Sequence, residues 1–128
     1  MGYCMTQMEQ NFRMKGENLD AAEIALKNAL KKGKINAWVD NANAIAVPGL
    51  KRVMEKCRWD IVIDDTHDVE EIYFTGEKLG DDFEVFKAIA PYVEANSYIQ
   101  MMGEDGYIWR WHFDGKNVIE QEGKIVFE

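Results

Sequence analysis

Tyr98-Ile-Gln-Met-Met-Gly-Glu-Asp-Gly106, then Tyr107-Ile-Trp-Arg-Trp-His-Phe113, then Asp114 to Glu128: this stretch decides the predicted fold. It consists of short β-forming runs separated by turns that contain glycine, which is the pattern of an antiparallel meander. The last run predicts a final strand over residues 124–128.

The central run of this stretch, residues 107–113, alternates strictly between the two faces of a strand. One face carries only large aromatic rings, and that much apolar surface needs a cover such as packed helices. The opposite face is suited to contact with solvent. The aromatic face consists of Tyr107, Trp109, Trp111 and Phe113, and the other face of Ile108, Arg110 and His112.

Upstream of the meander, hydrophobic periodicity and turn residues predict a regular order of elements. Asn18 caps a helix that Gly33 ends, and Pro48 opens a second helix. Asp81 caps a third, which Pro91 kinks. In order, the elements are a bent strand (3–8 and 12–14), a helix (19–32), a short strand or buried anchor (37–39), a turn (40–43), a helix (48–58), a hairpin (59–63 and 69–75, turning at 64–68), a loop (76–80) and a helix (81–93).

This order predicts an α+β fold in which one antiparallel sheet, ending in the C-terminal meander, is covered on one face by helices. Without the second helix and the last strands, the order is strand-helix-strand-strand-helix-strand, which is the ferredoxin-like arrangement. The length of 128 residues predicts a single domain over residues 1–128.

The composition indicates a folded domain with reduced thiols. A hydrophobic content of 47% supports a packed core. Cys4 and Cys57 are too few for a disulfide framework, and Cys57 lies on the apolar stripe of the second predicted helix, as a core thiol would. The sequence has no apolar run long enough to span a membrane and no secretory signal pattern, so we expect a cytoplasmic protein.

Charge is distributed unevenly along the chain. Residues 1–59 hold ten basic and six acidic side chains, a net charge of +4, whereas residues 60–105 hold two basic and thirteen acidic ones, a net charge of −11. Residues 106–128 are close to balanced, and the whole chain carries −8. Such asymmetry suggests a charged partner.

Several chemistries find little support in the sequence. The run Asp64-Asp-Thr-His-Asp68 could bind a metal, but its spacing is not that of an EF-hand, and zinc usually requires more His or Cys. Such a run is also typical of a solvated turn. Ser97 is the only serine and has no nucleophile motif around it, while His67 and His112 remain candidate bases. No phosphate-binding glycine loop occurs. We therefore predict no catalytic residue, metal site or cofactor.

Nucleic-acid binding could use the aromatic strand as a stacking platform. It would also require a basic groove, and Arg110 points to the opposite face of a chain whose net charge is −8. The aromatic face is therefore interpreted as core, and no direct contact with nucleic acid is expected.

The acidic block remains as the one candidate binding surface. Carboxylates placed along a rigid face can neutralise the Arg and Lys side chains of another protein that would otherwise hold phosphates, although such a block can also serve solubility alone. The predicted partner-binding acidic face consists of Asp64, Asp65, Asp68, Glu70, Glu71, Asp81, Asp82 and Glu84.

Several short segments together resemble a family of small uncharacterised proteins from Gram-positive bacteria and their phages or other mobile elements. The most specific segment is Gly103-Glu-Asp-Gly106 followed by Trp109-Arg-Trp111, and Gly76-Glu-Lys-Leu-Gly80 and Ala88-Ile-Ala-Pro91 add to it. The resemblance implies a bacterial cytoplasm and a phage or mobile-element origin. It implies no activity, cofactor or catalytic residue.

The sequence thus favours a non-enzymatic, protein-binding domain that inhibits a host nucleic-acid-processing or defence protein through its acidic face. The alternative is an intracellular accessory domain that forms a homodimer through sheet edges or exposed aromatic side chains. The least favoured hypothesis is a metal-dependent enzyme that uses the acidic turn over residues 64–71.

Overall fold

The computed structural model of the chain describes residues 2–123, so the strand predicted over residues 124–128 lies outside the described residues. It shows an α+β architecture with six strands and four α-helices in this range. In chain order the elements are β1 (Met5–Asn11), the 3-10 helix η1 (Gly16–Asn18), α1 (Leu19–Lys31), α2 (Asn41–Ala46), α3 (Leu50–Lys56), β2 (Trp59–Ile63), β3 (Val69–Phe74), α4 (Asp82–Ile89), the 3-10 helix η2 (Ala90–Tyr92), β4 (Tyr98–Gly103), β5 (Ile108–Phe113) and β6 (Val118–Glu122).

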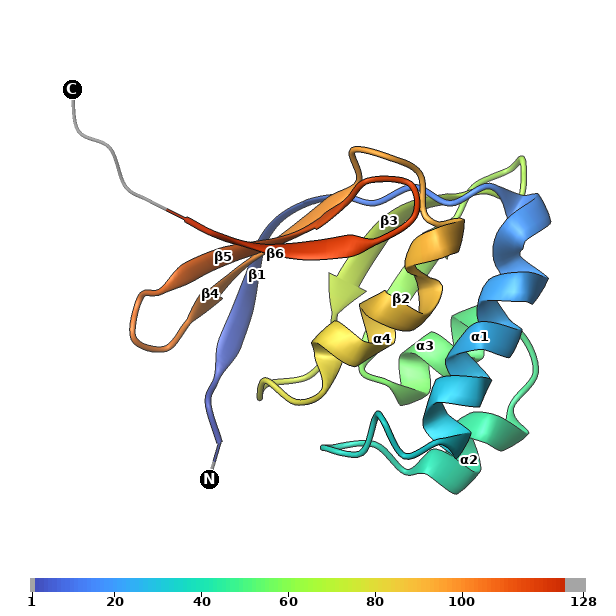
Figure 1. Cartoon of the computed structure of the whole chain (residues 1–128), viewed down its shortest axis with the longest axis horizontal. Coiled ribbons are helices and arrows are strands. Elements are labelled where there is room, and N and C mark those ends of the chain that lie inside the picture. Colours follow the sequence, from blue (N-terminus) through green and yellow to red (C-terminus); the bar gives the residue numbers. More distant parts are fainter. Residues whose placement is uncertain (1, 124–128) are drawn as a thin grey trace.

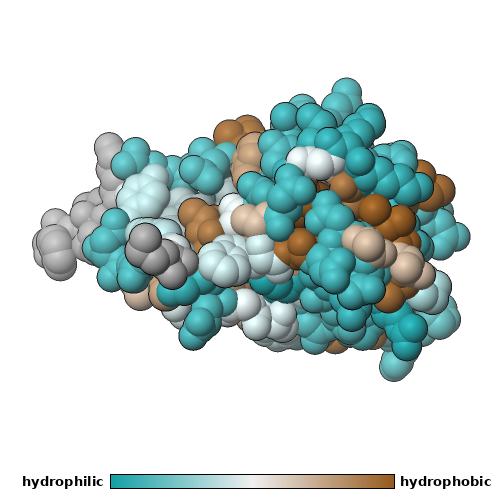
Figure 2. All heavy atoms as spheres, turned by 90° about the horizontal axis from the view of Figure 1, so that it is seen from below, coloured by the Kyte–Doolittle hydropathy of each residue, from teal (hydrophilic) through white to brown (hydrophobic). Residues whose placement is uncertain are grey.

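The strands form two antiparallel sheets, one of four strands in the order β1-β4-β5-β6 and one formed by β2 and β3. The predicted meander is therefore confirmed over β4, β5 and β6. Figure 1 shows the helices gathered on one side of the molecule, with the β4–β5 hairpin extending beyond them. From below, the helical half shows groups of apolar residues among hydrophilic ones (Figure 2). None of the helices within residues 2–123 has the length and apolar character needed to cross a lipid bilayer.

The predicted single sheet is not confirmed, because β1 and β3 lie side by side without a continuous ladder. Isolated bridges flank this boundary: Cys4, just before β1, pairs with Lys78 beyond the end of β3, and Met14, beyond the end of β1, pairs with Val69. Between these bridges, Gln7 Nε2 donates to the Ile72 carbonyl at 2.8 Å and Gln7 Oε1 accepts from the Phe74 N–H at 2.6 Å. Side-chain amides thus replace part of the missing ladder, and we call this boundary the β1–β3 seam. The ferredoxin-like arrangement stays a prediction.

Three of the four aromatic side chains that were predicted to lie in the core are packed inside the molecule, and the prediction was wrong for Tyr107. Trp109, Trp111 and Phe113 are at most 3% exposed, while Tyr107, just before the strand, is 40% exposed. Phe86 of α4 lies at the centre of this core, with its ring centroid 4.9 Å from that of Trp59 in β2 and 5.2 Å from that of Trp111 in β5. α4 therefore packs against both sheets and holds them together through this aromatic side chain.

The segment between α1 and β2 differs most from the prediction. Residues 40–43 were predicted as a turn, but they begin α2, because the Asp40 side chain accepts a hydrogen bond from the Asn43 N–H and caps the helix. Residues 37–39 form no strand, and Trp38 is no buried anchor, since it is 53% exposed.

Replacement of Gln7 by alanine should destabilise the protein, because the Ile72 carbonyl and the Phe74 N–H would lose their partner in a partly buried seam. We expect a loss of about 1–3 kcal/mol in the free energy of unfolding. Urea denaturation measures this loss, with Gln121→Ala on the exposed edge strand β6 as the matched control. Equal stability of the two variants would contradict the bridging role of Gln7.

Candidate interaction surface

The predicted acidic face is divided between the two ends of the β2–β3 hairpin. Asp64, Asp65 and Asp68 occupy the turn that joins the two strands, and Glu70 and Glu71 follow at the start of β3. In Figure 1 this turn lies beside the beginning of α1, whereas α4, which carries the other predicted carboxylates, begins at the far end of the hairpin. The remaining three, Asp81, Asp82 and Glu84, lie at the start of α4.

The carboxylates of the turn are largely used in holding its shape. Asp64 Oδ1 accepts hydrogen bonds from the Thr66 N–H at 2.8 Å, the Thr66 hydroxyl at 2.6 Å and the Asp68 N–H at 3.1 Å. Asp68 Oδ1 accepts from the Gly16 N–H at 2.7 Å, which ties the turn to the entrance of α1. The hydrogen bonds from Thr66 and Asp68 lower the pKa of Asp64 below its ordinary value. Arg13, Lys15 and Glu94 line the same small hollow as this turn, and Lys15 Nζ lies 3.5 Å from Glu94 Oε1, so Arg13 is the cation that offsets the charge of the turn there.

Asp82 is not part of any surface, and its assignment to the acidic face was wrong. Its side chain is 1% exposed and forms two 3.0 Å hydrogen bonds with Arg58 Nη2. It also accepts from Trp59 Nε1 at 2.8 Å and from the Gly80 N–H at 2.8 Å. A carboxylate can be buried in this way because both of its oxygens accept hydrogen bonds, two of them from a charged guanidinium, although the Nε atom of Arg58 is left without a partner.

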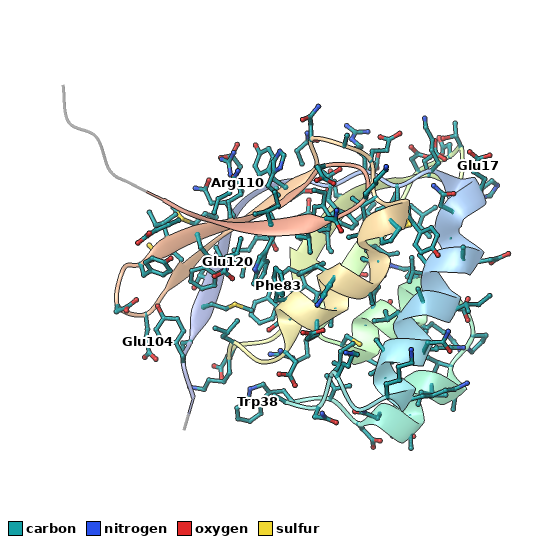
Figure 3. All side chains as sticks on the ribbon, viewed as in Figure 1. Glu17, Trp38, Phe83, Glu104, Arg110 and Glu120 are labelled. Carbon is teal, nitrogen blue, oxygen red and sulfur yellow. The ribbon has the colours of Figure 1, made fainter. Side chains whose placement is uncertain are left out.

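The sequence predicted that Asp81 caps α4, but its side chain makes no capping hydrogen bond. It binds instead a loop that is distant in sequence. Its Oδ2 atom accepts hydrogen bonds from the backbone N–H groups of Asn36 at 2.8 Å and Ala37 at 3.0 Å. These two residues precede Trp38, so the carboxylate fixes the loop that presents the exposed indole. Figure 3 shows Trp38 at the lower edge of the molecule, near the start of β1.

A groove follows the β1–β3 seam and continues to Trp38. Its first hollow, of about 450 Å³, is lined by residues 6–10 of β1 and by Tyr73 and Phe74 of β3. A second hollow of about 320 Å³ shares Thr6, Gln7 and Phe74 with the first and extends to Glu77. A third, of about 210 Å³, shares Glu77 with the second and is lined by Trp38, Arg58 and Lys78. We call this set of adjoining hollows the seam groove.

Acidic and aromatic side chains border the seam groove. Glu9 and Glu77 line it directly, and Glu71 accepts a hydrogen bond from the Tyr73 hydroxyl on the β3 bank. Glu9 accepts from the Tyr98 hydroxyl at 2.7 Å. Glu9 was not predicted as a site residue, because it lies far from the acidic block in sequence, and Glu77 lies within that block but was not assigned to the predicted acidic face. Trp38 and Arg58 were also missed, because no local pattern joins them to these carboxylates.

The structure offers little support for metal or thiol chemistry in the residues that it describes. Between residues 2 and 123, no three His, Cys, Asp or Glu side chains are placed so that they could together hold a metal ion. Cys57 is fully buried, as predicted, and burial raises the pKa of its thiol to about 12. A thiol with that pKa is almost entirely protonated at neutral pH and is therefore a poor nucleophile.

Comparison of the chain with protein-family models, with curated proteins and with solved structures produced no match. The geometry of the seam groove and its charged lining are therefore the features of the molecule that bear on its function.

Removal of the Asp82 carboxylate by Asp82→Ala should leave the Arg58 guanidinium, whose side chain is 14% exposed, without its counter-ion. We expect a loss of about 3–5 kcal/mol in the free energy of unfolding, the usual cost of breaking a buried ion pair from one side. Chemical denaturation provides the measurement, and Glu84→Ala in the same helical turn is the control. A variant as stable as that control would show that the pair is not structural.

The Asp64 turn should make part of the stability depend on pH. The pKa of Asp64 is lower in the folded protein than in the unfolded chain, so the ionised carboxylate stabilises the folded state. This stabilisation is fully present at pH values above the ordinary carboxyl pKa of about 4, and it is lost as the pH falls through the folded-state pKa. The stability difference between the natural protein and Asp64→Asn should therefore be largest near neutral pH and should shrink in acid. Thermal unfolding from neutral to acidic pH measures it, with the exposed neighbour variant Asp65→Asn as control. A pH-independent difference would disprove this role.

Proposed function

We propose that this protein is a non-enzymatic domain that binds another protein carrying a basic surface, and that the seam groove is the binding site. The observation that carries the proposal is the groove itself, which brings carboxylates from β1 and from the segment after β3 to one elongated depression. Carboxylates on a rigid rim attract a partner with a basic surface and repel proteins with an acidic surface. The net charge of −8 disfavours direct binding to nucleic acid.

The biological role that fits this chemistry best is inhibition of a nucleic-acid-processing or defence protein, in which the carboxylates compete with phosphates for the same basic side chains. The resemblance to proteins of phages and mobile elements supports this role and a cytoplasmic location. We also propose that β2, β3, β1 and β4 act as one ferredoxin-like sheet, with the β1–β3 seam as its central contact. The bridges at both ends of the seam support that view.

The proposal predicts a basic partner whose binding weakens as salt is raised. The immobilised protein would be incubated with lysate of the bacterial host, and captured proteins would be identified by mass spectrometry, purified and titrated by calorimetry. We expect the dissociation constant to rise about tenfold or more between low and physiological ionic strength, because rim charges are screened. If the partner is a nuclease, an equimolar amount of the protein should suppress its cleavage of DNA.

A pair of triple variants separates the seam groove from general acidity. Glu9→Gln, Glu71→Gln and Glu77→Gln together should weaken binding of the purified partner about tenfold or more. The control combines three exposed changes away from the groove, Glu17→Gln, Asp20→Asn and Glu122→Gln, and should bind like the natural protein. The proposal would be refuted if the groove triple variant bound the partner as tightly as the natural protein does, or if the control triple variant lost as much affinity as the groove triple variant.

A further inference from the structure

The seam groove has the shape of a site for an extended polypeptide. Its β1 bank runs from Cys4 to Gln10, seven residues that span roughly 20 Å in an extended strand. The first two hollows share Thr6, Gln7 and Phe74 along this bank, and the third, at Trp38, shares Glu77 with the second, so the three follow one another from β1 to Trp38. A segment of about six extended residues would fill that length, whereas a single compact small molecule would not.

The floor of the groove is already satisfied in its hydrogen bonding. The Ile72 carbonyl and the Phe74 N–H are bonded to Gln7, and the Ile72 N–H donates to Gln10 Oε1 at 3.3 Å. A bound segment therefore finds no free ladder on β3 opposite Gln7 and cannot be recognised there as an added strand. Recognition must come from its side chains, and the carboxylates of Glu9, Glu71 and Glu77 select lysine or arginine.

The end of the groove at Trp38 has a different chemistry. Of the two cations that line it, Arg58 is paired with Asp82, whereas Lys78, whose Nζ lies 2.9 Å from Cys4 Sγ, keeps its positive charge beside Glu77. What remains accessible is the indole ring of Trp38, 53% exposed, beside the aliphatic parts of its neighbours. A bulky apolar side chain fits such a hollow of about 210 Å³ better than an anion does.

Trp38 is held in place with an unusual degree of constraint. Its backbone φ of 66° and that of Arg58, 74°, lie in the left-handed region that bulky residues rarely adopt. Added Cβ atoms on Gly2 and Gly80 would lie only 3.2 and 2.9 Å from the indole, so the ring is packed between two glycine backbones. Strained residues that the surroundings hold firmly are typical of ligand clamps, and tryptophan is enriched among residues that dominate binding.

We propose that the seam groove takes an extended basic segment of the partner protein, and that one bulky apolar side chain of this segment anchors on Trp38. This inference rests on the proposed function and adds the form of the partner's contact. The carboxylates of Glu9 on β1, Glu71 on β3 and Glu77 after β3 supply charge complementarity, and the succession of hollows places the apolar anchor at one end of the basic stretch. A second copy of this chain is a poor occupant, because its own carboxylates would repel those of the groove.

Synthetic peptides test this inference without the natural partner. The probe is a fluorescein-labelled hexapeptide of alternating lysine and threonine with a terminal leucine. Two companion peptides replace the leucine by serine or each lysine by glutamate. Fluorescence anisotropy at low ionic strength should show binding of the first peptide, about tenfold weaker binding of the serine peptide, and none of the glutamate peptide.

Trp38→Ala should weaken binding of the leucine peptide about tenfold and leave binding of the serine peptide unchanged. The matched control is Ile24→Ala, which removes another exposed apolar side chain, on α1, and should have no effect. Chemical-shift changes in amide NMR spectra should fall on residues 4–10 and 73–78 and on the Trp38 indole. These spectra also report whether each variant is folded, so a loss of binding that is caused by unfolding is recognised directly. The shift changes of the natural protein show whether the peptide occupies the seam groove.

The outcomes separate this inference from the proposed function. If a captured basic partner depends on Glu9, Glu71 and Glu77 but the peptides do not bind, or shifts fall elsewhere, the extended-segment inference is wrong and the proposed function stands. If the peptides bind as expected but no basic partner depends on the groove carboxylates, the proposed function fails while the groove keeps its specificity. Equal binding of leucine and serine peptides would overturn the Trp38 anchor alone.

Discussion

The arrangement of this protein depends on how β1 is shared between two neighbours. On one side it forms a ladder with β4, and on the other it meets β3 through the amides of Gln7 and Gln10. A side-chain amide offers donors and an acceptor, as a peptide group does, so it satisfies backbone groups of β3 without drawing the strands to the usual spacing of about 4.8 Å. The same hydrogen bonds that complete the fold therefore leave a groove along its surface.

Aromatic packing holds the two sides of that seam together from within. Phe86 contacts Trp59 of the smaller sheet and Trp111 of the larger one, so α4 links elements that share little direct hydrogen bonding. Asp82, four residues earlier on the same helix, adds a buried ion pair with Arg58. α4 therefore contacts residues of both sheets and Arg58, which lines the seam groove. We expect a substitution in α4 to alter the shape of the groove.

The sequence predicted what local periodicity can encode and missed what depends on distant partners. Alternation over residues 107–113 identified β5 and its buried face, and the stripe of α1 identified that helix. A glutamine in a strand, by contrast, looks like an ordinary solvent-facing residue, so the role of Gln7 was invisible. Asp82 was assigned to the surface because it sits in a run of acids, while its partner Arg58 lies 24 residues away. Burial of a charge depends on such a partner, which composition does not reveal.

The outer edges of the two sheets bear on the choice between a protein partner and a homodimer. On the β2 edge, Lys51 Nζ donates to the Ile61 carbonyl at 2.8 Å, which occupies a backbone acceptor that another strand would need. The β6 strand carries Glu120 and Glu122 within five residues, so antiparallel pairing of two copies would place like charges near each other. Within residues 2–123, both edges therefore carry features that oppose self-association, whereas the seam groove is lined by the carboxylates of Glu9 and Glu77. These features agree better with the proposed partner, a different protein of opposite charge, than with a second copy of this chain.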